Sequence, residues 1–324
     1  MMHEWLVVLS VVVAPGSSQE VRLEQPLTAR LRTSFGDFDS NRQVLVSYRN
    51  SESRDDPSVV AIDLAGRVLL QATPLKDFPK ATKVDVWDAA ATSSGVVVAA
   101  VIQDGRPPRH ALLLYGGNGT LEELWQVYPN HIRNLAVDRS DNVYALVDRM
   151  EVRPAEHLMV KYSQDGKVAR EFLPANLFPK GQRSVIPSGR SGDNQLWIVG
   201  DRLMLYMASV EELLEFDLEG NLQRRVPLAD QLLSLVKEAG GSRAQIRHIS
   251  SVDEPDAIVA QVGIWVEGRG FSFGLVRLSL VGGAPQRLRL SQDDDLGGPF
   301  APLLGSSRGR LLFLNTSEGV LAWR

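Results

Sequence analysis

Five basic residues lie at similar distances before a series of predicted turn residues. This shared spacing suggests that their side chains could lie close together and bind an anion. Three of them lie nine positions before a turn residue, and two lie eleven and twelve positions before theirs. The five are Arg32, Arg133 and Arg247, then Arg183 and Lys83. Gathered together, they would suit a carboxylate or phosphate, which arginine binds through two parallel hydrogen bonds. The alternative is ordinary ion pairs with carboxylates such as Asp37 and Asp85.

Four histidines lie in or near segments predicted to be loops, namely His110, His131, His157 and His248. Imidazoles from separate loops could assemble a zinc or iron site, with His131 and His248 as the main candidates. The alternative is that they are exposed loop residues. The sequence has no His-x-x-x-His pair, no Gly-x-Ser-x-Gly elbow and no phosphate-binding glycine loop. No local motif therefore assigns a catalytic acid, base or nucleophile, and we expect no metal or other cofactor.

The elements that would position these side chains are short strands joined by tight turns. Asn, Asp and Gly accept the positive φ that tight hairpin turns demand, and each candidate turn is followed by an apolar run of strand length. A first turn recurs six times, 47 to 62 residues apart, at Asn41, Gly95, Asn142, Asn194, Asp256 and Gly309. A second turn follows at Gly66, Gly119, Gly166, Gly220 and Gly282 or Gly283.

Each repeat therefore contains two hairpins, or four strands. A four-stranded unit recurring at about 40 to 50 residues is typical of a β-propeller blade. The sequence predicts an all-β fold, a six-bladed β-propeller with four-stranded antiparallel blades in one domain over residues 19–324. The sixth repeat has room for only three strands, so we expect residues 20–32 to add the last strand and close the ring. A helix is also predicted near residues 230–241, with Asp230 as its N-cap.

The stretch "NLAVDRSDNVYALVDR" and the following "LMVKYSQDGKVAREF", within residues 134–172, resemble a repeat of the NHL-like six-bladed propellers of exported bacterial proteins. That resemblance implies a fold much more than a reaction, because the family includes scaffolds, ligand sensors and a few lyases. In such a fold the basic residues would meet at the mouth of the central channel. The loops predicted at the same end are long and varied, and binding concentrates in such loops.

Composition limits the function further. The chain has 324 residues, a formal net charge of −4 and no cysteine. It therefore has no disulfide and no thiolate ligand or nucleophile, and its charge gives no reason to expect nucleic acid as a partner. The apolar run from Trp5 to Ala14 is too short to span a membrane and suits a signal peptide over residues 1–18. The alternative is a buried first strand in a cytoplasmic protein.

These observations favour a non-catalytic binding or scaffold propeller that is exported to the periplasm or the cell exterior. We expect it to bind an anionic small molecule, a peptide or a protein at its loop-rich face and channel mouth. The residues expected there are Arg32, Lys83, Arg133, Arg183, Arg247, His131 and His248. The alternative is an NHL-like metal-dependent lyase or hydrolase with its site at the same mouth.

Overall fold

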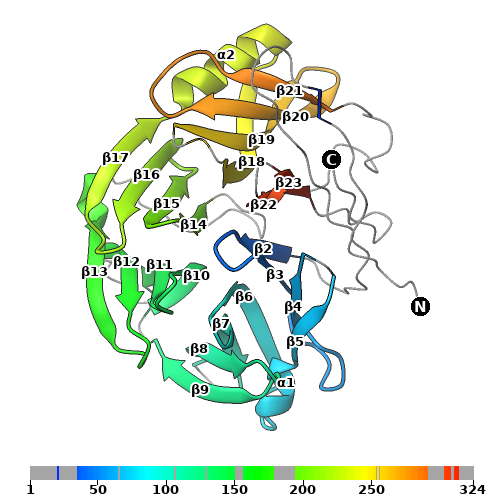
Figure 1. Ribbon diagram of the computed structural model, residues 1–324, viewed down its shortest axis with the longest axis vertical. Helices are drawn as coiled ribbons and strands as arrows, with labels where there is room; N and C mark the ends of the chain where they lie inside the picture. The colour runs from blue at the N-terminus through cyan, green and yellow to red at the C-terminus, as the bar shows by residue number, and fades with distance from the viewer. Residues whose placement is uncertain are drawn as a thin grey trace.

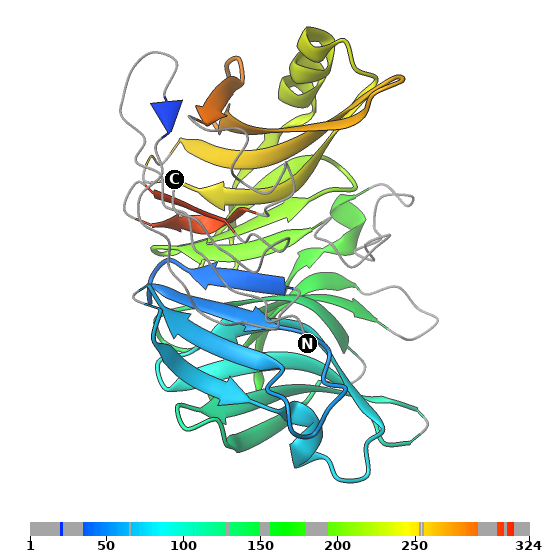
Figure 2. The ribbon, with the colours of Figure 1, turned by 90° about the vertical axis from the view of Figure 1, so that its right-hand side faces the viewer.

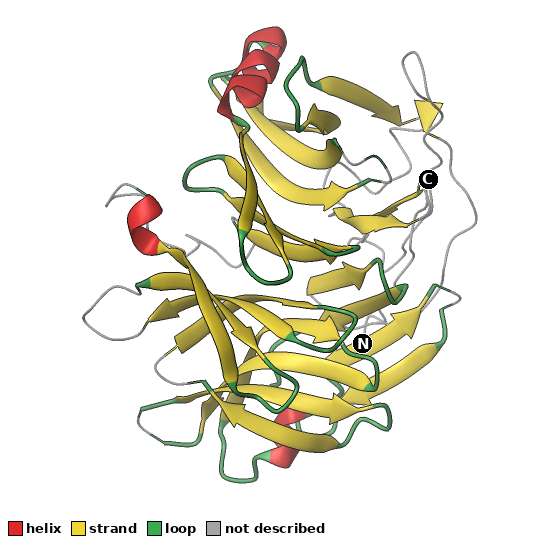
Figure 3. Ribbon diagram, turned by 60° about the vertical axis from the view of Figure 1, so that its left-hand side comes forward, coloured by secondary structure: helices red, strands yellow, loops and turns green. Residues whose placement is uncertain are grey.

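A computed structural model describes most of the chain. The described residues are 20–21, 35–64, 66–105, 107–127, 130–149, 156–178, 194–252, 254, 256–290, 303–307 and 310–313. The predicted signal peptide lies outside them. Strands dominate, and Figure 3 shows only short helical segments beside them. No helix in the described part is long and apolar enough to cross a membrane.

Five sheets make up most of the fold, each built on four antiparallel strands in sequence order, and a two-residue strand, β1 (Glu20–Val21), adds to the edge of the fifth. The first contains β2 (Phe35–Asp39), β3 (Val44–Tyr48), β4 (Val59–Asp63) and β5 (Val68–Ala72). The second contains β6 (Lys83–Ala91), β7 (Gly95–Gln103), β8 (Arg109–Gly116) and β9 (Leu121–Gln126). The third contains β10 (Asn130–Val137), β11 (Val143–Arg149), β12 (His157–Tyr162) and β13 (Val168–Pro174).

The remaining two sheets follow the same plan. The fourth contains β14 (Gln195–Val199), β15 (Arg202–Met207), β16 (Glu212–Asp217) and β17 (Leu222–Pro227). The fifth contains β18 (Arg243–Ser251), β19 (Ala257–Val266), β20 (Gly270–Ser279) and β21 (Gln286–Leu290). Three short helical segments lie in the links between sheets, α1 (Pro74–Asp77), η1 (Ala175–Leu177) and α2 (Ala229–Ala239).

The sheets stand around a common centre as the blades of a β-propeller (Figure 1). The first strand of each blade is innermost, and these strands contact one another in the order β2, β6, β10, β14 and β18. The ring is completed by β22 (Leu303–Ser307), which contacts β18 on one side and β2 on the other and pairs with β23 (Arg310–Phe313). We call the end at which the innermost strands begin, near Lys83, Asn130 and Arg243, the loop-rich face.

The predicted four-stranded propeller is confirmed, but the predicted count of six blades is wrong for the described residues. They form five four-stranded blades, and a two-stranded sheet stands at the sixth position. The expected N-terminal closure is also different. Glu20 and Val21 form β1, which pairs in parallel with Arg289 and Leu290 of the fifth blade. The outer edge of β21 offers unpaired backbone groups, and β1 satisfies them there.

The first turn of the fourth blade also differs from the sequence prediction. Asn194 precedes the innermost strand β14, and the turn lies at Gly200, whose φ is 59°. The Asn194 side chain accepts a hydrogen bond from the Ala208 amide at 2.9 Å, so it joins the two strands at the end opposite the turn. An Asn can satisfy backbone amides as readily as it can take a turn conformation, and sequence alone does not separate these roles.

The hydrophobic core lies between neighbouring blades. Separate buried clusters join the first blade to the second, the second to the third, the third to the fourth, and the fourth to the fifth. The strand β7 is therefore apolar along most of its length, because both of its faces are covered. The helix α2 packs on β18 and β19 and ends at Gly240 in a left-handed conformation, so the predicted helix is confirmed. The predicted N-cap is wrong, because Leu228 occupies that position without a side-chain hydrogen bond and Asp230 lies within the first turn.

The glycines of the second turns hold neighbouring blades together. A Cβ atom at Gly119 would collide with the backbone carbonyl oxygen of Gln71 on β5, and one at Gly166 would meet the Trp125 ring on β9. A Cβ atom at Gly220 would lie 2.9 Å from the Phe172 ring on β13. Each turn thus presses directly on the outer half of the preceding blade.

We expect Gly119→Ala to lower the free energy of unfolding by about 2 kcal/mol, since φ is +76° there and the added carbon has no space. Urea titration followed by tryptophan fluorescence would measure this change. Gly105→Ala is the matched control, because a Cβ atom there has nothing within 4 Å and we expect a change within about 0.5 kcal/mol. Equal effects in the two variants would contradict the proposed blade contact.

Candidate functional site

Three innermost strands of the four-stranded blades are interrupted by a β-bulge at the same level, and β22 has a bulge as well, between Leu303 and Gly305. The register shifts between Val86 and Asp88 in β6, between Ile132 and Asn134 in β10, and between Ile246 and His248 in β18. The residues inserted at these points are Trp87, Arg133 and Arg247. A bulge bends its strand and re-aims one side chain, and such bulges are frequent beside functional sites. The propeller therefore presents one aromatic and two guanidinium side chains from equivalent positions.

Polar side chains from the preceding blades fix two of these bulged strands. The Leu135 amide donates to Asp88 Oδ2 at 2.7 Å, and the Ile249 amide donates to Gln195 Oε1 at 2.8 Å. In each strand the donor lies two residues after the bulge. Innermost strands are sheet edges, so these amides need a partner from outside their own sheet. Asp88 and Gln195 supply it across the blade interface.

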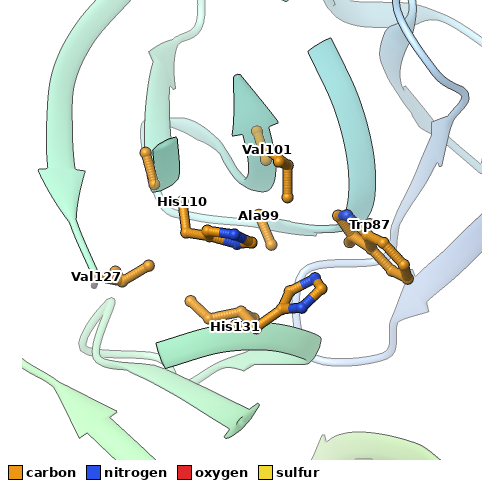
Figure 4. Close-up of a pocket in the computed structure, with 9 residues that line it drawn as sticks. Trp87, Ala99, Val101, His110, Val127 and His131 are labelled. Atoms are coloured by element: carbon orange, nitrogen blue, oxygen red, sulfur yellow. The ribbon is translucent and has the colours of Figure 1, made fainter. Parts of the chain in front are cut away.

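The bulge residue Trp87 belongs to a ring cluster between the second and third blades (Figure 4). The His131 ring meets the Trp87 ring edge-on with centroids 4.8 Å apart, and it lies 4.5 Å from the His110 ring. The Arg133 guanidinium lies 4.7 Å from the centre of the Trp87 ring. Three elements of the second and third blades, β6, β8 and β10, thus bring these four side chains together.

Burial keeps both imidazoles neutral. The pKa of His131 falls to about 3, mainly because the ring is buried and also because of the Arg133 charge and the neighbouring His110. Burial, and then the Arg133 charge, lowers the pKa of His110 as well. Within the described ranges, Trp87 Nε1, His110 Nε2 and His131 Nε2 have no hydrogen-bond partner.

A narrow crevice lies among these rings, with Ala99, Val101 and Val127 in its wall (Figure 4). It has no room for a water molecule between its side chains. The Nε2 atoms of both histidines are thus shielded from water although the His131 ring is partly exposed, and burial dominates the pKa values of both. Its walls must separate before any ligand enters.

The two histidines expected to share a site belong to different blades. His131 lies on β10 and His248 on β18, two blades apart, whereas His131 contacts His110. His157 lies on β12 with its Nδ1 atom 3.6 Å from Glu171. In the described part of the chain, no three histidine or acidic side chains are grouped so that they could hold a metal ion.

The basic residues expected at the channel mouth have different surroundings. Lys83 pairs with Asp85 at 2.7 Å, and Arg133 pairs with Asp148 at 3.5 Å, as the ion-pair alternative predicted. Arg247 has no such carboxylate among the described residues, and its guanidinium lies over the rings of Phe271 and Phe273. The Nε atoms of Arg133 and Arg247 are buried without a hydrogen-bond partner in the described structure.

Arg32 and Arg183 lie outside the described residues. The spacing argument for Arg183 depends on Asn194, a predicted turn residue that lies eleven positions after it. Asn194 precedes an innermost strand and the turn lies at Gly200, so this spacing no longer supports Arg183. Sequence reasoning missed Trp87, although it lies eight positions before Gly95 and so nearly matches the spacing of Arg133 and Arg247. Alignment of the repeats on their first turns would have identified it.

The fold and these side chains define a β-propeller with basic and aromatic groups at equivalent places on its innermost strands. No protein-family model matches the chain, and no curated protein matches it. Solved structures do match. A protein of unknown function from Bacteroides caccae is 13% identical, with 88% of this chain and 93% of that chain covered and a TM-score of 0.44.

The structures of two lyases match this chain about as well. A streptogramin B lyase is 11% identical, with 98% of this chain and 97% of that chain covered and a TM-score of 0.46. Virginiamycin B lyase from Staphylococcus aureus is 8% identical, with 97% and 94% covered and a TM-score of 0.44. Because these TM-scores lie below 0.5, no activity is carried over from these proteins, and the propeller assignment rests on the sheets themselves.

Proposed function

We propose that this chain is a non-catalytic binding propeller that takes an anionic ligand at its loop-rich face. The observation that carries the proposal is the pair of arginines at equivalent bulges, Arg133 and Arg247, each with a buried Nε that has no hydrogen-bond partner in the described structure. A guanidinium has five N–H donors, and a buried donor without a partner is costly. A bound carboxylate or phosphate would satisfy two of them at once.

Arg247 is the stronger of the two candidates. Its charge has no carboxylate partner among the described residues, whereas Arg133 is already paired with Asp148. The neighbouring His248 adds no positive charge at neutral pH, because burial, and then the Arg247 charge, lowers its pKa to about 4. An anion beside Arg247 would therefore meet a guanidinium that has no competing carboxylate among the described residues.

An anion that binds this site should raise the melting temperature of the protein. Ligand at one hundred times its dissociation constant adds about 2.7 kcal/mol to the stability of the folded state. Phosphate, sulfate and succinate would be compared with chloride at constant ionic strength, so that general salt screening is the same in every sample. We expect at least one of these anions to give a shift of a few degrees.

The variant Arg247→Met should abolish the shift, since methionine keeps apolar packing on the Phe271 ring but has no charge. Arg133→Met should reduce it. Arg67→Met is the control, because that side chain is 79% exposed in the second turn of the first blade and pairs with Asp63. An anion-specific shift that persists in Arg247→Met, or no such shift in the parent protein, would overturn the proposed function.

A further inference from the structure

The hairpin of the fifth blade extends an aromatic surface toward the loop-rich face. Its strands β19 and β20 have ten residues each and project beyond the neighbouring strands (Figure 2). Trp265 is the cross-strand partner of both Arg243 and Phe271. Phe273 lies two residues after Phe271 and faces Gly263. Cross-strand partners share a sheet face, so these side chains form one surface.

The alternation along β19 places Trp265 on the open face and its buried neighbours on the opposite face. Val262 and Ile264 point into the core shared with the fourth blade and α2. Trp265, on the other face, keeps 39% of its surface exposed. Gly263 makes room for the rings, since a Cβ atom there would lie 2.7 Å from the Phe273 ring. The Phe271 and Phe273 rings stack with centroids 5.8 Å apart, and Trp265 meets Phe271 edge-on at 5.1 Å.

Two guanidinium groups converge on the same phenyl ring. Arg243 lies 5.3 Å and Arg247 lies 5.4 Å from the centre of the Phe271 ring. The Arg247 Nε atom is buried without a hydrogen-bond partner in the described structure. The ring face attracts both cations, but the two positive charges repel each other. An oxyanion bound by both groups would remove that repulsion.

We propose that Arg243, Arg247, Trp265, Phe271 and Phe273, here called the blade-five clamp, bind a planar aromatic ring that carries a carboxylate. This inference rests on the proposed function and names its ligand class. The carboxylate contacts the two guanidiniums, and the ring stacks on the exposed indole and the phenyl ring beside it. Stacking on aromatic side chains favours a planar ring over a puckered aliphatic one of similar size.

Calorimetric titration of the full chain with three probes tests this ligand class. The probes are 2-naphthoate, decahydro-2-naphthoate, which has the same anion on an aliphatic bicycle of similar size, and 2-naphthamide, which has the same ring without the charge. We expect 2-naphthoate to bind about tenfold more tightly than decahydro-2-naphthoate, in line with the usual strength of aromatic stacking. We expect the amide to bind at least tenfold more weakly than 2-naphthoate, because it lacks the charge that both arginines attract.

Variants separate the two halves of the clamp. Trp265→Ala should remove the preference for 2-naphthoate but keep decahydro-2-naphthoate binding. Trp265→Phe should restore part of that preference. Arg243→Met should weaken both carboxylates. Arg225→Met is the matched control and should change neither, because that guanidinium also lies over a ring, Phe178 at 5.5 Å, but is already paired with Glu212 at 2.6 Å.

The outcomes distinguish this inference from the proposed function. Equal affinity for the two carboxylates, with binding still lost in Arg247→Met, would overturn the aromatic clamp and leave the anion site in place. Naphthoate binding that is unchanged by Trp265→Ala or Arg243→Met would also overturn the clamp. Equal binding of 2-naphthoate and 2-naphthamide would show adsorption to an apolar surface. If no carboxylate binds and no inorganic anion shifts the melting temperature, both proposals fail.

Discussion

Replacing Asp88 by alanine should lower the free energy of unfolding at pH 7 by about 3 kcal/mol. The Asp88 side chain is 6% exposed and accepts hydrogen bonds from the Leu135 amide at 2.7 Å and the Ala89 amide at 2.8 Å. It also has a hydrogen bond with the Tyr48 side chain. Alanine would remove the acceptor of the Leu135 and Ala89 amides and would break the hydrogen bond that joins the second blade to the bulged strand of the third.

The destabilisation caused by losing these hydrogen bonds is partly compensated in the variants. The parent protein buries the Asp88 charge, which is unfavourable, and the substitution removes that charge. Burial raises the pKa of Asp88 to about 6 despite the hydrogen bonds that lower it. Asp88→Asn removes the charge and keeps one acceptor oxygen, so only one amide loses its acceptor. We expect this variant to be destabilised by about 1 kcal/mol, clearly less than the alanine variant.

Urea titration at pH 7 would measure both changes. Asp85→Ala is the matched control on the same strand, since Asp85 is half-buried and contacts Lys83 and Gln103 near the strand start. We expect that control to change the stability by less than about 1 kcal/mol. An Asp88→Ala variant within the same range as the control would contradict the role assigned to Asp88.

Acidification from pH 7 to pH 4 should destabilise the protein, most clearly in the Asp88→Asn background. Burial lowers the pKa of His248 to about 4 and that of His131 to about 3. Between pH 6.5 and pH 4 the unfolded chain then binds more protons than the folded chain, so the free energy of unfolding falls as the pH falls. His248 accounts for about 3 kcal/mol over this window. We assign His131 about 2 kcal/mol, a smaller value because solvent screens its partly exposed ring.

In the parent protein, Asp88 opposes the loss of stability that the two histidines cause on acidification. Its pKa is raised in the folded state, so between pH 6 and pH 3.8 the folded chain binds more protons and gains stability as the pH falls. This gain, about 3 kcal/mol, cancels part of the histidine effect. We therefore expect a net loss of about 2 kcal/mol in the parent and about 5 kcal/mol in Asp88→Asn.

Urea titrations at pH 7, 6, 5 and 4 would test this pH dependence. His248→Gln in the Asp88→Asn background should recover about 3 kcal/mol at pH 4 relative to pH 7. His157→Gln is the control, because that half-buried imidazole lies on the third strand of its blade beside Glu171. If the pH dependence of the free energy of unfolding is the same with and without His248→Gln, the effect cannot be assigned to a buried neutral His248.

The sequence by itself determined the repeat and most of its turns. The second turns were predicted at Gly66, Gly119, Gly166 and Gly220, and all four have positive φ. These features are local, because a tight turn needs particular residue types within a few positions. The same reasoning misplaced the first turn of the fourth blade at Asn194, where the side chain bonds to the Ala208 amide. It also expected residues 20–32 to complete the last blade, whereas Glu20 and Val21 pair with the fifth.

The tertiary structure decided which side chains meet. The spacing to the turns selected Arg133 and Arg247, but only the packed blades show that one has a carboxylate partner and that the other lies over Phe271 and Phe273. Likewise, no local pattern places His110 beside His131. Such contacts join residues from different strands and blades, so they depend on how twisted sheets stack around the axis, whereas turn chemistry and strand alternation act within a few residues.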